Sequence, residues 1–432
     1  MPEKLRIAWF SPLQMGGHSE ASGAAYLSSE VLPHLFNKFE IDLFHSQAGS
    51  WQGQPVQHYL SAWQRHRQRP YDIFSYQLED SPCCDYIQMH LGLVPGVVCF
   101  HDCFSVRTGP AALGNSNWRQ SIREFNSGVL ETPDEVERSL GCFWRAAGLA
   151  GIALFSDPSQ RERYRRESPL RLESEMQTLR SSNLLWPVDP APGAVKVSGD
   201  GHTLAYCGAP RVEHRPHKLL EALSGCERAF RLLWLIDREE EAQARALLAE
   251  YDLGGVELRL GRTPAAWQAL LSKADIAIHS FFSTLGQPGP YFNISLMMGL
   301  PCVVTDSQTF EHVSSDLVFK VRPGSTEAVE MREVLQTLYG VRDFPGRAAQ
   351  RQFAREMFSS EVVAKELGIL FQMTAPLMRE MMKRSDELRA QKMSRIVEGV
   401  REGFAETAGQ SPLGAEIVWK LHEPTFKEFG WL

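Results

Sequence analysis

Short apolar segments alternate with amphipathic segments along most of the 432 residues of this chain. In the first half, runs rich in β-branched and aromatic side chains predict buried strands. These runs are residues 5–10, 39–46, 71–78, 94–100 and 151–156. Helices are predicted at residues 24–36, where apolar residues recur at helical spacing, at 85–93, and in the charged segments 115–147 and 160–166. The alternation predicts a parallel sheet with helical crossovers on both faces.

The alternation pauses over residues 181–202, which are rich in Pro, Gly and Ser, and then starts again. Strands are predicted at 202–208, 230–236, 256–261, 275–281 and 301–306, and helices at 217–223, 239–251, 263–274 and 292–299. We therefore expect an α/β protein with a Rossmann-like domain at 1–185, a linker at 186–200 and a second Rossmann-like domain at 201–372. One large α/β domain is the alternative.

The pattern changes after Met373, so we expect a helical tail at 373–432. Residues 377–406 predict a long, charged, amphipathic helix, and the last seventeen residues, EIVWKLHEPTFKEFGWL, are rich in aromatic side chains. The helix either packs back over the first domain, contacts a partner or second copy, or touches a membrane surface. Its mixed charge argues against a strong membrane anchor.

Composition narrows the function classes. Apolar residues make up 43% of the chain, enough for two cores, and the net charge of −7 comes without a basic stripe, which argues against nucleic-acid binding. No apolar run approaches the roughly 20 residues of a membrane span, and MPEKLRIAWFSP reads as a strand rather than a signal peptide. A cytoplasmic protein is expected, with the inner face of the membrane as a possible location.

Eight scattered cysteines without a C-x-x-C pair do not favour a zinc site.

Two features place candidate chemistry at strand ends. The apolar run VPGVVCF ends on His101-Asp102, and a loop with Gly16 and Gly17 follows the first strand. In open parallel sheets, ligands bind beyond the carboxyl ends of the strands. Small residues in the loop allow the backbone N–H groups to approach phosphate or sugar oxygens. The structural alternatives are a hydrogen-bonded His101, an Asp102 that caps a turn, and a loop that is only a flexible turn.

Seven segments resemble, in order, the sequence blocks of bacterial family 4 glycosyltransferases, over most of residues 5–372. They are SPLQMGGHSEASGAAYLSSEVLPHL, YDIFSYQLEDSP, PGVVCFHDCF, ALFSDPSQRERYRR, AYCGAPRVEHRPHKLLEAL, VELRLGRTPAAWQALLSKADIAIHS and MMGLPCVVTDSQTFEHVSSDLVFKV. The resemblance implies the GT-B fold, with two Rossmann-like domains facing across a cleft. It also implies retaining, metal-independent transfer from a nucleotide sugar to a glycan, lipid-linked or protein acceptor, as in polysaccharide biosynthesis, with no bound cofactor.

The resemblance also assigns roles to residues. Without a metal, the departing pyrophosphate needs arginine, lysine or a helix N-terminus for charge stabilisation. Arg211, Arg215 and Lys218 lie where such proteins bind the diphosphate, although His214 falls where a lysine is common. His101 is expected to contact the donor sugar, with Asp102 as the second catalytic candidate. Since the departing phosphate oxygen can accept the acceptor proton, no carboxylate pair at glycosidase spacing is required.

The segment 279–301 departs from the family pattern, because it lacks the glutamates that usually hold the ribose or sugar. Gly286 or Gln287 and Ile294 occupy those positions, and no acidic residue occurs between Asp275 and Asp306. The donor-binding residues expected in this region are Gly286, Gln287, Asn293 and Glu311. Either the donor is held differently, or activity is lost and the protein is a binding or scaffold partner. A third interpretation, a sugar-nucleotide epimerase, requires catalytic carboxylates that the sequence does not identify.

Overall fold

The computed structural model of the chain describes residues 4–15, 22–79, 81–101, 146, 149–155, 161, 175–178, 202–210, 214–251, 253–281, 290–341 and 344–407. The chain divides into one compact unit at Met1–Met373 and a second at Thr374–Leu432. Among the described residues, no helix is both long and apolar enough to span a membrane. The predicted linker and most of the predicted helix at 115–147 lie outside the described residues.

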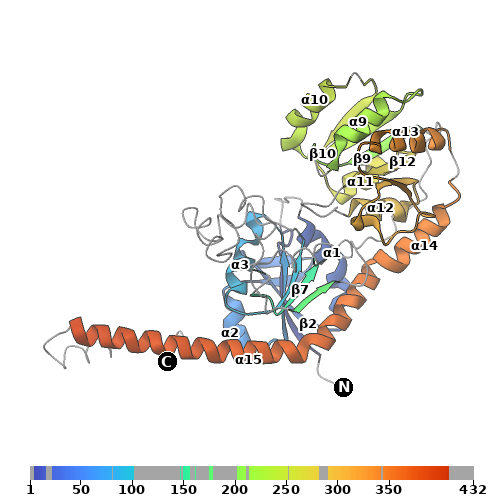
Figure 1. Ribbon diagram of the computed structural model, residues 1–432. Helices are drawn as coiled ribbons and strands as arrows, with labels where there is room; N and C mark the ends of the chain where they lie inside the picture. The colour runs from blue at the N-terminus through green and yellow to red at the C-terminus, as the bar shows by residue number, and fades with distance from the viewer. Residues whose placement is uncertain are drawn as a thin grey trace. The chain divides into compact units, whose positions relative to one another are not determined.

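The first half forms an eight-stranded sheet with the strand order β3-β4-β2-β1-β5-β6-β7-β8 (Figure 1). The strands are β1 (Arg6–Phe10), β2 (Glu40–His45), β3 (Gly49–Trp51), β4 (Gln54–His58), β5 (Ile73–Leu78), β6 (Val97–Phe100), β7 (Ile152–Phe155) and β8 (Glu175–Thr178). All neighbouring strands are parallel except the β3–β4 hairpin. This confirms the predicted parallel sheet, whereas the hairpin was not predicted.

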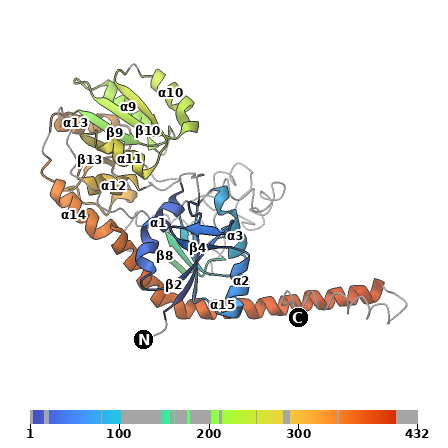
Figure 2. The ribbon, with the colours of Figure 1, turned by 180° about the vertical axis from the view of Figure 1, so that it is seen from behind.

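The helices of this half cover both faces of the sheet. Figures 1 and 2 show α1 (Gly23–Leu35) on one face and α2 (Ser61–Gln68) and α3 (Asp85–Leu91) on the other. Alternate residues of β1 point to opposite faces. The Trp9 indole N–H donates to Ser28 Oγ of α1, while the ring of Phe10 packs against Phe44 and His90. Side chains on the two faces of β1 therefore contact helices on both sides of the sheet.

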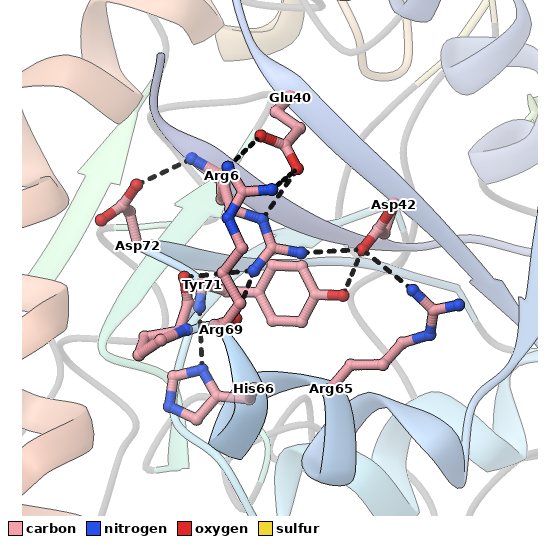
Figure 3. A network of polar contacts seen from close by, with 9 residues as sticks. Arg6, Glu40, Asp42, Arg65, His66, Arg69, Tyr71 and Asp72 are labelled. Carbon is pink, nitrogen blue, oxygen red and sulfur yellow. Dashed lines mark hydrogen bonds and ion pairs between the residues drawn. The ribbon is translucent and has the colours of Figure 1, made fainter. Parts of the chain in front are cut away.

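A charged network closes the amino ends of the strands. Arg6 begins β1, and its guanidinium binds Glu40 and Asp42 of β2 at 3.0 and 3.1 Å. Arg69 binds the same Glu40 carboxylate through both terminal nitrogens, at 2.6 and 2.7 Å. The Tyr71 hydroxyl donates to Asp42, and the Arg6 guanidinium stacks over the Tyr71 ring (Figure 3). Because this network lies at the amino ends, it leaves the carboxyl ends, where ligands bind in such sheets, to other residues.

The second half forms a six-stranded, fully parallel sheet with the order β11-β10-β9-β12-β13-β14. The strands are β9 (Thr203–Cys207), β10 (Arg231–Ile236), β11 (Val256–Leu260), β12 (Ile276–His279), β13 (Cys302–Thr305) and β14 (Phe319–Val321). The strand order reverses between β9 and β12, as it does between β1 and β5 in the first sheet. These two reversals give each sheet a topological switch point.

Helices again cover both faces of the second sheet. They are α9 (Pro216–Ser224), α10 (Glu241–Ala249), α11 (Pro264–Leu271), α12 (Tyr291–Met298), α13 (Glu327–Leu338) and α14 (Arg347–Phe358), with short 3₁₀ turns at Arg238–Glu240 and Gln308–Phe310. Residues of α9, α10 and α13 share one buried cluster with one face of the sheet, and α11 and α12 lie on the other side (Figure 1). The two Rossmann-like sheets confirm the predicted fold class.

The last helix is longer than the sequence pattern predicts. Helix α15 runs from Ser360 to Thr407 as one continuous helix, so it begins well before the boundary expected at residue 373. Its first turns contact the first half of the chain. Ser360 Oγ donates to Glu30 Oε2 at 3.1 Å, and the ring of Phe371 packs edge-on against Trp9 and Phe39. The periodicity change after Met373 therefore marks a change in composition, not the start of a helix.

Candidate functional site

At the switch point of the second sheet, residues directly after β9 and directly before α9 are held by hydrogen bonds. The Tyr206 hydroxyl and Ser280 Oγ both donate to the carbonyl oxygen of His214, at 2.7 and 2.9 Å. The Trp234 indole N–H donates to the carbonyl of Gly208 at 2.8 Å. A Cβ atom on Gly208 would lie 2.5 Å from the Tyr206 hydroxyl oxygen, so the loop has room only for glycine. These contacts fix the start of α9 between β9 and β12.

Arg215 precedes α9 and forms an ion pair with a buried carboxylate. Its Nε donates to Glu327 Oε1 at 2.8 Å, and Nη2 contacts Glu327 Oε2. The Glu327 side chain is fully buried at the start of α13, and that of Arg215 is 16% exposed. Arg215 also has a positive φ of 52°, a conformation that costs a non-glycine residue energy. The bidentate pair holds this backbone conformation and joins the starts of α9 and α13.

Lys218 lies in the first turn of α9 and has a weaker partner. Its ammonium group donates to Glu221 Oε2 at 2.8 Å, three residues along the same helix. His217 lies between the two cations in sequence. Burial, followed by the positive charges of Arg215 and Lys218, lowers the pKa of His217. The start of α9 therefore places two cations, each paired with a carboxylate, beside a helix N-terminus at the carboxyl edge of the sheet, where an anion is favoured.

Helix α12 contributes mainly buried groups. Asn293 is fully buried in the first turn, and the ring of Phe292 packs between His279 and Phe310. Phe292 is therefore a core residue, 1% exposed. His279 Nε2 lies 3.0 Å from Ser295 Oγ, and burial lowers the pKa of His279 to about 3. The Glu311 side chain, by contrast, is exposed after the 3₁₀ turn that follows β13.

His101 lies at the carboxyl end of β6 in the first sheet. It is 2% exposed, and its Nε2 lies 3.0 Å from Gln77 Oε1. Because the Gln77 amide nitrogen donates to Ser75 Oγ, the Gln77 oxygen accepts from His101 Nε2–H, which leaves Nδ1 as the acceptor nitrogen of the ring. Burial lowers the pKa of His101 to about 3. His101 is thus a neutral hydrogen-bonding group at neutral pH.

Glu79 is a site residue that the sequence interpretation missed. It follows β5 directly at the switch point, it is 7% exposed, and its Oε2 accepts from the backbone N–H of Ala24 at 3.0 Å. Ser22 Oγ caps the same helix by accepting from Ala25 N–H at 3.0 Å. An acidic residue directly after a buried strand, in SYQLED, was the available signal. The first turn of α1 therefore already binds a carboxylate from its own chain.

Glu79, Cys83 and Cys84 form the one possible metal-ligand cluster within the described residues, with ligand atoms within 4.8 Å of one another. Cys84 Sγ lies 3.7 Å from the carbonyl oxygen of Gln77, and Cys83 Sγ lies 3.1 Å from Ser81 Oγ. Burial raises the pKa of the Cys84 thiol well above its ordinary value. Zinc requires thiolates, and the Glu79 carboxylate already accepts a hydrogen bond from Ala24 N–H. These three residues are therefore better explained as packing at the end of β5 than as a metal site.

The other predicted site residues lie outside the described residues. These are Gly16, Gly17, Asp102, Arg211, Gly286 and Gln287. Of the remaining candidates, the structure brings Arg215 and Lys218 together at the start of α9, while His101 lies at the edge of the first sheet. The predicted roles of all these residues remain predictions.

Comparison with solved structures identifies the fold. Sucrose-phosphate synthase from Thermosynechococcus elongatus matches 86% of this chain and 99% of its own, with a TM-score of 0.59 and 14% identity. A glycosyltransferase from Rickettsia africae matches 86% of this chain and 98% of its own, with a TM-score of 0.57 and 13% identity. Anabaena HepE, in a complex with UDP, matches 85% of this chain and 100% of its own, with a TM-score of 0.55 and 12% identity. At these identities the likeness shows the fold alone, which is of the GT-B type.

No protein-family model matches the sequence, and a search of the curated proteins finds no match.

Proposed function

We propose that this protein is a glycosyltransferase that moves a sugar from a nucleotide-sugar donor to a glycan, lipid-linked or protein acceptor. The start of α9 is the observation that carries the proposal, because this helix N-terminus, with Arg215 and Lys218, lies at the switch point of the second Rossmann-like sheet. In such sheets a helix start beside the switch point receives phosphate groups. The similarity to solved glycosyltransferases of the same fold supports the assignment.

In this proposal the cations bind the donor diphosphate and stabilise the negative charge that grows as the glycosidic bond breaks. Lys218 is the cation best able to turn toward a phosphate, since its partner Glu221 is a 47%-exposed carboxylate. Arg215 is anchored by Glu327 and acts mainly by fixing the loop and adding positive potential. We propose a retaining, metal-independent reaction in which a phosphate oxygen of the departing diphosphate takes the acceptor proton.

In this proposed reaction, His101 contacts the donor sugar. A neutral imidazole held through Nε2–H by Gln77 at the carboxyl end of β6 can hydrogen-bond to a sugar hydroxyl without adding charge. Removal of one neutral hydrogen bond to the reacting sugar costs about 0.5 to 1.5 kcal/mol, so we expect His101→Ala to lower kcat by about 2- to 10-fold. The KM for the donor should change little if His101 acts on the sugar rather than on the diphosphate.

Thermal unfolding with UDP, GDP, ADP and their sugars tests the proposed function. HepE has been crystallised with UDP and with UDP-glucose, so UDP is the first nucleotide to try. We expect one nucleotide family to raise the unfolding temperature of the full chain, and its sugar conjugate to support glycosyl transfer. A flat response to all three families would reject the proposal and favour the alternative, a binding or scaffold protein with this fold.

A further inference from the structure

Four aromatic and imidazole rings gather at the carboxyl ends of β2 and β4, where no predicted site residue lies. His45 and His58 are the last residues of these strands and face each other in the parallel register. The ring of Tyr86, in the first turn of α3, lies 5.5 Å from that of His45 and 5.4 Å from that of Tyr59. The rings of His58 and Tyr59 are 4.8 Å apart. Tyr86 is buried, whereas the other three rings are partly exposed.

The backbone fixes the tautomer of both histidines. The N–H of Gln47 donates to His45 Nδ1 at 3.1 Å, and the N–H of Leu60 donates to His58 Nδ1 at 3.3 Å. Since an Nδ1 that accepts a hydrogen bond carries no proton, each neutral ring carries its proton on Nε2. Burial and the nearby His58 lower the pKa of His45, which favours the neutral ring. Two adjacent strand ends thus offer two imidazole N–H donors, and within the described residues neither Nε2 has a protein hydrogen-bond partner.

We propose that His45, His58 and Tyr59 form a subsite that binds a neutral sugar ring of the acceptor. This inference rests on the proposed glycosyltransferase function and adds the chemical class of the acceptor group. Two imidazole N–H donors suit hydroxyl oxygens, and a partly exposed phenol ring suits the apolar C–H face of a sugar. A phosphate group would instead favour charged partners, and none of the hydrogen bonds in this cluster involves an ionised side chain. The subsite lies at the same carboxyl edge of the first sheet as His101.

Two variants of His58 separate its proposed role in sugar binding from its role in the local structure. In His58→Asn, the side-chain oxygen lies near the position of Nδ1, so it keeps the bond from Leu60 N–H and removes the outward donor. In His58→Gln, the amide nitrogen lies near the position of Nε2, so it keeps the outward donor and loses the inward acceptor. Sugar binding should therefore be weakened about tenfold by His58→Asn and far less by His58→Gln. A purely structural His58 would give the reverse order.

The experiment uses the full chain and the methyl glycosides of glucose, galactose, mannose and N-acetylglucosamine as probes, followed by the imidazole Cε1–H resonances of His45 and His58. We expect at least one glycoside to shift both resonances, and inorganic phosphate to shift neither. If His58→Asn fails to fold, Tyr59→Ala, which leaves both Nδ1 contacts in place, should weaken binding of the same glycoside. The inference is overturned if no glycoside shifts either resonance, if phosphate alone does so, or if the two His58 variants bind equally.

Nucleotide affinity separates this inference from the proposed function. The His58 and Tyr59 variants should bind UDP with the calorimetric affinity of the wild type, because no contact links this cluster to the start of α9 in the described residues. If the wild type binds the glycoside but no nucleotide, the glycosyltransferase proposal fails and the sugar subsite stands. If the wild type binds nucleotide and no glycoside, the subsite fails and the proposed function stands.

Discussion

Arg215 and Lys218 begin the same helix, but their carboxylate partners differ in burial. Glu327 is fully buried against Arg215, whereas Glu221 is about half exposed beside Lys218. Removing one member of a buried pair leaves an uncompensated charge and is strongly destabilising, whereas loss of a surface pair costs little. The two cations are equivalent in the sequence, and only the fold separates their roles.

Arg215→Ala should therefore lower the free energy of unfolding by about 3 kcal/mol. Lys218→Ala should lower it by no more than about 0.5 kcal/mol and should still weaken nucleotide binding. Urea unfolding and calorimetry with UDP measure the two effects. Lys218→Gln, which keeps a hydrogen-bonding side chain that is one atom shorter and uncharged, is the matched control. Wild-type nucleotide affinity in both Lys218 variants would remove this residue from the donor site.

At the scale of elements, helix α1 shows how the first sheet holds the helix that follows its glycine-rich loop. Two of its early N–H groups are bound by Ser22 Oγ and by the buried carboxylate of Glu79. A carboxylate at a helix N-terminus is favoured by the hydrogen bond and by the helix dipole together. Glu79 therefore positions the start of α1 at the edge of the sheet.

Glu79→Ala should cost about 1 to 2 kcal/mol of stability and speed the hydrogen exchange of the Ala24 amide. Glu79→Gln keeps an acceptor oxygen and loses only the charge, so its loss of stability should be smaller. Urea unfolding and exchange at Ala24 give both readouts. Equal losses in the two variants, or an unchanged exchange rate at Ala24, would contradict the capping role.

The elements that the sequence predicted best are those with long, regular patterns. The strand predicted at 230–236 is β10, and the helix predicted at 292–299 is α12, which is capped by Gly299 with a positive φ of 72°. The β3–β4 hairpin was missed because its strands are short and its turn, Gln52-Gly53, lacks the usual Asn or Asp. The partner of Arg215 was also missed, because Glu327 lies 112 residues away and local spacing says nothing about such a pair.

At the scale of the whole molecule, the buried His101 and His279 and the partly buried His312 make the stability of the fold depend on pH. Burial lowers the pKa of His101 and His279 to about 3, and burial with the nearby Lys320 lowers that of His312 to about 4. The unfolded chain binds protons at these residues near pH 6.5, whereas the folded chain does not. The unfolded state therefore holds more protons between these values, and stability falls as the pH drops below about 6.5.

Together the three histidines should contribute a slope of up to about 4 kcal/mol per pH unit to the free energy of unfolding between pH 4 and 6. Urea unfolding at a series of pH values measures the slope. His279→Gln keeps an amide nitrogen near Ser295 and cannot take up a proton, so it should reduce the slope by about one third. An unchanged slope in this variant would show that His279 titrates normally in the folded chain.

The central claim is that a nucleotide diphosphate binds at the start of α9, and the titration of His217 tests it most directly. Burial and the charges of Arg215 and Lys218 lower the pKa of His217. A bound diphosphate offsets these positive charges and so should raise it. We predict that nuclear magnetic resonance with and without saturating UDP shows this rise in the wild type and a smaller rise in Lys218→Gln. A His217 pKa that stays unchanged when UDP is bound would place the nucleotide elsewhere and contradict the account.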